Sequence, residues 1–127
     1  MSRLIGALLI IFLLPACIEN DRPTPFCDVA NPIEDLAWLK AIIIDLEESI
    51  AEDDNHFFDT FWFKQFSYQG TQYFMQGDCC ASCFRVPIYF NCVGDTITFE
   101  VPPLEVDSLL QTINSGEIIW QGGSCSF

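Results

Sequence analysis

Residues 57–74, FFDTFWFKQFSYQGTQYF, carry the strongest fold signal in this 127-residue chain. Aromatic residues are enriched in β-strands, and this stretch is dense in them. Tyr68-Gln69-Gly70-Thr71 has a glycine where a tight hairpin turn requires a positive φ. The stretch therefore predicts an antiparallel hairpin with one strand on each side of this turn.

Alternation along the first strand of this hairpin distributes its rings over two faces of the sheet. Trp62, Phe66 and Tyr68 fall on one face, and Phe61 and Phe63 fall on the other. One helix covers only one face well. We therefore expect one set to pack under a helix, with Trp62 more buried than Phe63. The other set is either core under a loop or an exposed platform for a glycan or a protein partner.

A helix is predicted from Pro32 to Ala51. Asn31 suits the N-cap, Pro32 suits the first helical position, and Glu34 stands where it would complete a capping box. Apolar residues at helical spacing form one stripe, widened on a flank by Trp38 and Ile42: Ile33, Leu36, Leu39, Ile43, Leu46 and Ile50. The stripe is expected to face a sheet.

The second half of the chain predicts a hairpin, a short helix and a last strand. The hairpin covers 84–101 with a turn at Val93-Gly94-Asp95, and the helix runs from about Leu104 to Asn114. The last strand is Glu117–Gln121. No βαβ alternation is present, so we expect an α+β fold. Its antiparallel sheet has about five strands, with one long N-terminal and one short C-terminal helix packed on one side.

Six cysteines follow Cys17: Cys27, Cys79, Cys80, Cys83, Cys92 and Cys125. In an oxidising compartment they are expected to form disulfides that staple the domain. Cys79 and Cys80 are adjacent, so we expect them to reach different partners. The pairing that we predict is Cys92 with Cys125, Cys27 with Cys79 or Cys80, and Cys83 with the one left over.

The cysteine cluster has two alternative interpretations. Cys79–Cys83 together with His56 supplies soft ligands for zinc, although zinc sites usually have two paired half-sites. Cys80-Ala-Ser-Cys83 fits the CxxC redox pattern, but a strand-like segment follows it rather than a helix. We therefore expect disulfides, with no metal and no cofactor.

Acidic residues crowd the predicted end of the long helix, from Glu47 to Asp54. Clustered carboxylates suit a calcium or magnesium ion, but no EF-hand spacing is present. The helix dipole disfavours negative charge at this end. A solvated, mildly destabilised helix end is therefore the first interpretation, and a cation site is the alternative.

Leu14-Pro15-Ala16-Cys17 closes the apolar run of residues 4–14, which follows Arg3. A cationic start, a short apolar core and small residues at the cut site are typical of a secretory signal. A cysteine at this point resembles a bacterial lipobox. We therefore predict a signal peptide over 1–16, lipidation of Cys17, a polar tether over 17–26 and one small domain over 27–127. Ile18 after the lipidated cysteine favours the outer membrane.

The net charge of −13 restricts the partners of the chain. Nucleic-acid binding requires clustered basic residues, whereas Arg22, Lys40, Lys64 and Arg85 are scattered. The same charge opposes docking onto an anionic membrane surface, so the lipid on Cys17 is expected to provide the membrane contact.

The order of several motifs resembles that of a family of small bacterial lipoproteins. Those proteins have an Asn-Pro-Leu-Glu-x-Leu-x-Trp-Leu-Lys helix, a Tyr-x-Gly hairpin, a Cys-Cys pair and a Cys-x-Gly turn. The matching segments here are Cys27, Asn31–Lys40, Tyr68-Gln69-Gly70, Tyr73-Phe74, Cys79-Cys80 and Cys92-Val93-Gly94-Asp95. Residues 101–121 depart from the pattern. The family has no assigned activity, so the resemblance implies only architecture and export.

Catalytic patterns are absent from the sequence: it has no GxSxG, HExxH or glycine-rich phosphate loop, and His56 is its only histidine. The sequence predicts a non-enzymatic binding or structural lipoprotein. The alternative is a redox or metal-binding protein that uses the Cys79–Cys83 cluster.

Overall fold

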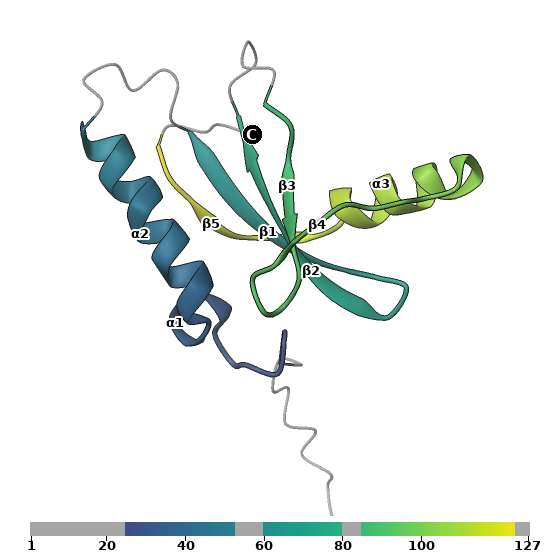
Figure 1. Cartoon of the computed structure of the whole chain (residues 1–127), viewed down its shortest axis with the longest axis horizontal. Coiled ribbons are helices and arrows are strands. Elements are labelled where there is room, and N and C mark those ends of the chain that lie inside the picture. The colour runs from purple at the N-terminus through teal and green to yellow at the C-terminus, as the bar shows by residue number, and fades with distance from the viewer. Residues whose placement is uncertain (1–24, 53–59, 80–84, 124–127) are drawn as a thin grey trace, which may run out of the picture.

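The computed structural model describes residues 25–52, 60–79 and 85–123, in which one antiparallel sheet lies between helices (Figure 1). The strands lie in the order β4-β3-β2-β1-β5. Their bounds are β1 Phe61–Tyr68, β2 Thr71–Asp78, β3 Ile88–Phe90, β4 Thr96–Ile97 and β5 Glu117–Gln121. The predicted α+β fold with a five-stranded antiparallel sheet is confirmed.

The β1–β2 hairpin is the centre of the sheet. It pairs without interruption from Tyr68↔Thr71 to Phe61↔Asp78. Gln69 and Gly70 have φ values of 50° and 78°, the conformation of a type I′ turn, whose twist matches that of the strands. The predicted hairpin and its turn are confirmed.

The predicted N-terminal helix is two helices, α1 (Pro32–Asp35) and α2 (Ala37–Glu52), because Leu36 is extended. The predicted capping box is wrong. The Asn31 side chain makes no capping hydrogen bond, and its backbone N–H donates to the Asp35 carboxylate at 2.9 Å. α1 is a single turn, and Asp35, its last residue, reaches back to Asn31. Glu34 instead forms an ion pair with Lys40 at 2.8 Å.

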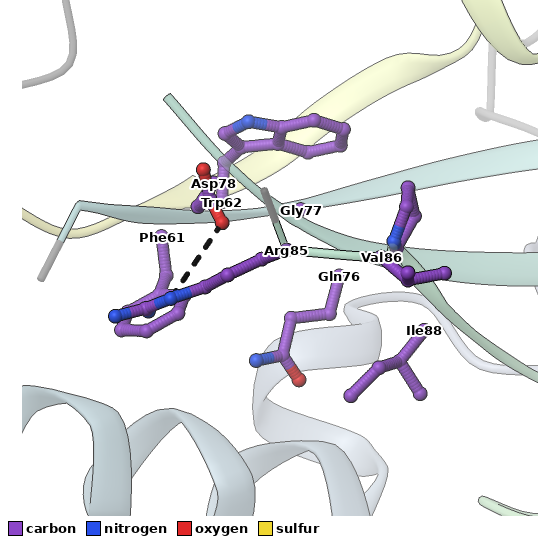
Figure 2. A pocket seen from close by; sticks show the side chains of 9 residues that line it. Phe61, Trp62, Gln76, Gly77, Asp78, Arg85, Val86 and Ile88 are labelled. Atoms are coloured by element: carbon purple, nitrogen blue, oxygen red, sulfur yellow. Dashed lines mark ion pairs between the residues drawn. The ribbon is translucent and has the colours of Figure 1, made fainter. Parts of the chain in front are cut away.

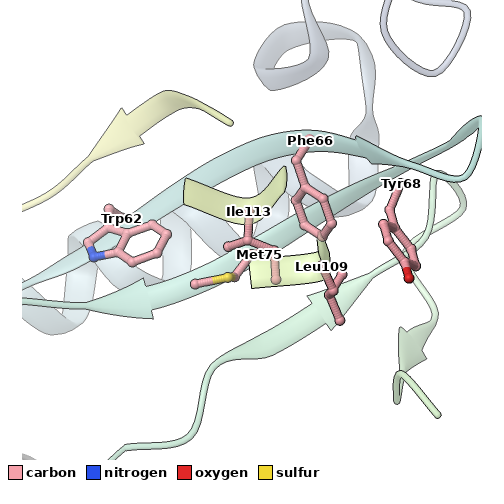
Figure 3. Close-up of a cluster of buried hydrophobic side chains, with 6 residues drawn as sticks. All are labelled: Trp62, Phe66, Tyr68, Met75, Leu109 and Ile113. Carbon is pink, nitrogen blue, oxygen red and sulfur yellow. The ribbon is translucent and has the colours of Figure 1, made fainter. Parts of the chain in front are cut away.

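The sheet carries a hydrophobic cluster on each face. The cluster under α2 consists of Leu39, Ile43, Phe63, Phe74 and Phe90. The other cluster lies under α3 (Val106–Asn114), which follows the 3-10 helix η1 (Pro103–Glu105). It consists of Trp62, Phe66, Tyr68, Met75, Leu109 and Ile113 (Figure 3).

The prediction that both helices pack on one side of the sheet is wrong, since α2 and α3 lie on opposite sides (Figure 1). β4 and β5 are the two edge strands, so the chain must cross the whole sheet between them. α3 makes that crossing over the face that α2 leaves open. Both faces carry large rings, and each therefore receives a helix of its own.

A β-bulge in β5 directs two consecutive side chains to the α2 face. Phe63 pairs with Trp120 and Lys64 pairs with Ile118, which leaves Ile119 as the extra residue. Ile119 and Trp120 both pack against the cluster under α2. The Trp120 indole N–H also donates to Glu47 at 3.2 Å, which ties the second half of α2 to β5.

One disulfide joins Cys27 to Cys92, so the predicted pairing of these two cysteines with others is wrong. Cys27 lies in a tight turn, and its backbone N–H donates at 2.6 Å to the side chain of Gln72, near the start of β2. Cys92 lies beside the same residue, because its Sγ contacts the Gln72 carbonyl oxygen at 3.7 Å. Cys79 follows the far end of β2, out of reach of Cys27.

Cys79 also takes part in a disulfide. Its partner lies outside the described residues, as do Cys80, Cys83 and Cys125. The disulfide-stapled character of the domain is thus confirmed. The predicted pairing of Cys125 with Cys92 is wrong, and that of Cys83 with Cys79 or Cys80 stays a prediction.

Candidate functional site

A pocket of about 370 Å³ opens where the two strands of the central hairpin end, at Phe61 and Asp78 (Figure 2). Its walls come from β1, β2 and the segment that leads into β3: Phe61, Trp62, Gln76, Gly77, Asp78, Arg85, Val86, Pro87 and Ile88.

The pocket exists because β3 pairs with only part of β2. The pairing runs from Phe74↔Phe90 to Gln76↔Ile88 and stops there, although β2 continues to Asp78. Pro87, directly before β3, has no N–H to donate and suits the start of a strand. Residues 85–87 therefore leave the sheet and form the outer wall.

A cross-strand tryptophan–glycine pair forms one wall of the pocket. Trp62 lies opposite Gly77 in the register, and a Cβ at position 77 would overlap the indole ring. Glycine at this position lets the indole lie across β2, where a cross-strand aromatic ring covers the backbone that a glycine exposes. Lys64 Nζ lies 5.4 Å from the centre of the Trp62 ring. The shape of the pocket therefore depends on Gly77.

The charged groups of the pocket are Arg85 and Asp78. The Arg85 guanidinium lies 5.0 Å from the centre of the Phe61 ring, and its Nε lies 3.9 Å from a carboxylate oxygen of Asp78 (Figure 2). The Asp78 side chain is only 8% exposed, whereas that of Arg85 is 42% exposed. A guanidinium over an aromatic face and beside a carboxylate is oriented by both. Arg85 is thus a positioned cation at the pocket rim.

Apolar side chains on the outer wall face solvent. Val86 is 84% exposed and Ile88 is 43% exposed. The pocket thereby combines aliphatic surface, an arginine and the Gln76 amide. None of its lining residues is a serine, cysteine, histidine or lysine, and its one carboxylate is ion-paired. This arrangement offers the contacts of a binding site.

The aromatic residues of β1 do not form an exposed platform. These residues are Phe61, Trp62, Phe63, Phe66 and Tyr68. Phe63 is fully buried under α2, and Phe66 and Tyr68 are 3% and 9% exposed on the α3 face. The expectation that Trp62 is more buried than Phe63 is wrong, since Trp62 is 9% exposed at the pocket. The physical reason is that each face has its own helix. Phe61 alone stays half-buried, under Arg85.

Sequence reasoning missed the outer wall of the pocket. Residues 84–91 read as one continuous strand, whereas the strand begins only at Ile88. Pro87 was the signal for this late start, because proline inside a strand pattern marks its beginning or an edge.

The acidic end of α2 shows no cation site in the part that the structure describes. Glu47 accepts the hydrogen bond from Trp120, and no group of three potential metal ligands occurs among the described residues. Asp53, Asp54 and His56 lie outside them, as do Cys80 and Cys83. Within the described residues, no helix has the length and apolar character to span a bilayer.

Comparisons with known proteins found no match for this chain, whether among family models, curated proteins or solved structures.

Proposed function

We propose that this chain is an exported, lipid-anchored protein whose domain binds a protein partner and is not an enzyme. The observation that carries the proposal is the Cys27–Cys92 disulfide, which joins residues 65 positions apart. Structural disulfides of this kind persist in oxidising compartments and are rare in the cytosol. They support export, to which the lipobox at Cys17 independently points.

The proposed binding site is the pocket at the open end of the central hairpin, named here the Phe61–Arg85 pocket. A glycan is usually recognised by an open aromatic face, but the guanidinium of Arg85 lies over the ring of Phe61. Val86 and Ile88 instead offer the exposed aliphatic surface that packs against apolar side chains of a protein. Arg85 at the rim provides a donor for a carboxylate or a backbone carbonyl.

Metabolic labelling with an alkyne analogue of palmitate tests the proposed lipid anchor at Cys17. The wild-type protein should be labelled and partition into detergent, and Cys17→Ser should lose both properties. Cys125→Ser is the matched control, because it removes a cysteine but leaves the lipobox intact. Labelling of the Cys17→Ser protein at the wild-type level would contradict the lipid anchor.

Photo-crosslinking in cells tests the binding site. A crosslinking amino acid at position 86 should give a discrete adduct, which Ile88→Asp should abolish. The control position is Leu104, which is 97% exposed and lies outside this pocket. Equal adducts from both positions, or no adduct from position 86, would contradict the site.

The alternative of a redox or metal protein is tested by counting thiols. Cys79 is already in a disulfide, and zinc binds thiolates rather than disulfide sulfur. Titration under denaturing, non-reducing conditions should find no more than one free thiol. Four or more free thiols, or bound zinc, would favour the alternative.

A further inference from the structure

A second cavity, of about 220 Å³, opens at the other end of the central hairpin, beside its turn. It is formed by the ends of β1 and β2 and by the segment between β4 and η1. Its lining residues are Tyr68, Gln69, Tyr73, Phe99, Glu100, Val101, Pro102 and Glu105. Tyr68 and Trp62 stand at opposite ends of the cluster in Figure 3, so this cavity and the Phe61–Arg85 pocket are well separated.

Three aromatic rings form the apolar side of this cavity. The ring of Phe99 lies 5.0 Å from that of Tyr73, at 75°, and 6.0 Å from that of Tyr68, at 88°. Because the rings meet almost at right angles, their negatively polarised faces and their edges point in different directions. Phe99 also contacts Phe66 and Tyr89, so the aromatic wall continues into the cluster under α3.

Two carboxylates form the polar side. Glu105 accepts hydrogen bonds from the Tyr68 hydroxyl at 3.4 Å and from the Gln69 amide at 3.2 Å. Glu100 directly follows Phe99 and is exposed. No lysine or arginine lines the cavity, and within the described residues neither carboxylate forms an ion pair. The cavity therefore combines three aromatic rings with two negative charges that no side chain of the lining neutralises.

The hydroxyl of Tyr68 responds to the same environment. Desolvation is the main cause that raises the pKa of Tyr68, and the negative charge of Glu105 raises this pKa further. Only the contribution of Glu105 bears on a charged ligand, because its negative charge opposes the phenolate and attracts a cation, whereas desolvation opposes both charges.

We propose that this cavity, named here the Tyr68–Glu105 pocket, binds an alkylammonium group. Ring faces attract such a cation through their quadrupole, and carboxylates neutralise it. A calcium ion is a poorer fit, since it takes six to eight oxygen ligands and the cavity offers three ring walls instead. The ligand chemistry is shared by two sources: the side chain of a lysine in a polypeptide and a small quaternary ammonium compound.

Calorimetric titrations of the oxidised full chain test the proposal with four probes. Tetramethylammonium and choline represent the quaternary source, and Nα-acetyl-lysine amide represents the peptide source. 3,3-Dimethylbutanol has the shape of choline without its charge. We expect at least one cation to bind and the neutral probe not to bind, and the preferred cation identifies the source. Binding of the neutral probe at the affinity of choline would overturn the proposal, as would no binding of any cation.

Two variants assign the binding to this cavity. Glu105→Gln removes one charge but keeps its shape, and Glu100→Gln removes the other charge at an exposed position, where folding is not at risk. Each should weaken binding of the preferred cation roughly 5- to 30-fold. Glu48→Gln is the matched control, since it removes an exposed charge of α2. Equal weakening by the control, or unchanged binding in both Glu100→Gln and Glu105→Gln, would overturn the site.

Discussion

The two faces of the sheet differ in how completely they are covered. Under α2, which has 16 residues, Leu39, Phe63 and Phe74 are all fully buried. Under α3, which has nine residues, no side chain of the cluster is fully buried, and Trp62 and Tyr68 each keep 9% of their surface. Trp62 lines the Phe61–Arg85 pocket and Tyr68 lines the Tyr68–Glu105 pocket, although the register places Gln76 and Ile88 of the first pocket on the α2 side. The comparison teaches that the shorter helix leaves both ends of its own face partly open.

Truncation of one phenylalanine on each face should give the largest difference. Phe63→Ala should cost about 3–5 kcal/mol of unfolding free energy, because its site is sealed and leaves a cavity. Phe66→Ala should cost less, since Phe66 lies beside an open pocket at which the structure can relax or hydrate. Urea denaturation of both variants measures the difference. A larger loss for Phe66→Ala would refute the view that the α2 face is the better sealed one.

Removal of the Cys27–Cys92 disulfide should lower the stability of the domain by a comparable amount, and the local structural change should lie on the α2 face. The chain-entropy account gives roughly 4 kcal/mol for a loop of this size. The bond also places Trp38, whose indole N–H donates to the Cys92 carbonyl at 3.1 Å. The Cys27→Ala/Cys92→Ala protein should therefore be less stable and lose part of its tryptophan near-UV signal. An unchanged melting temperature would show that the disulfide does not contribute to stability.

Two glycines with positive φ should differ when each is replaced by alanine. Gly70 has a φ of 78° and open space around its Cα, so Gly70→Ala should cost about 1 kcal/mol from conformation alone. Gly94 has a φ of 90°, and a Cβ there would lie 2.6 Å from Trp38. Gly94→Ala should therefore cost more, by about 1–3 kcal/mol of overpacking. Equal losses in thermal melts would mean that Trp38 moves aside without cost.

Alkaline pH should produce the smallest loss of stability, and this loss should come from tyrosines on the α3 face. The pKa of both Tyr68 and Tyr89 is raised, chiefly by desolvation. Folding therefore favours the neutral phenols. Their contribution is complete below pH 10, the unfolded value, and is lost as the pH rises through the folded values. Absorbance titration of the folded protein should show tyrosines that ionise above pH 10, and the Tyr68→Phe protein should show fewer of them. Titration of every tyrosine near pH 10 would contradict the raised pKa values of Tyr68 and Tyr89.

The fold could be predicted from the sequence because its signals are local. The aromatic alternation of residues 61–68, the Gln69-Gly70 turn and the spacing of Leu39 and Ile43 each follow from one stretch of chain. The covering of the second face could not be predicted in the same way. It depends on which face of the sheet α3 crosses, and the sequence of residues 106–114 does not determine that face.

The candidate site could be predicted only in part, because only some of its residues carry a local sequence signal. Phe61 and Trp62 were among the candidate residues, because their rings exceed what one covered face can bury. Arg85 and Ile88 come from a segment that pairs with β2 over only three residues, and register of that kind is set by tertiary contacts. The disulfide was mispaired because the position of Cys27 depends on a hydrogen bond to Gln72, 45 residues away.

The strand order β4-β3-β2-β1-β5 has a consequence for folding kinetics. β1 and β2 are adjacent in both sequence and space, so their hairpin closes only a two-residue loop. β5 instead pairs with β1 across about fifty residues of intervening chain. Closing so long a loop costs conformational entropy before the contacts between the two strands stabilise the pairing. The central hairpin is therefore the natural nucleus, and the docking of β5 completes the sheet.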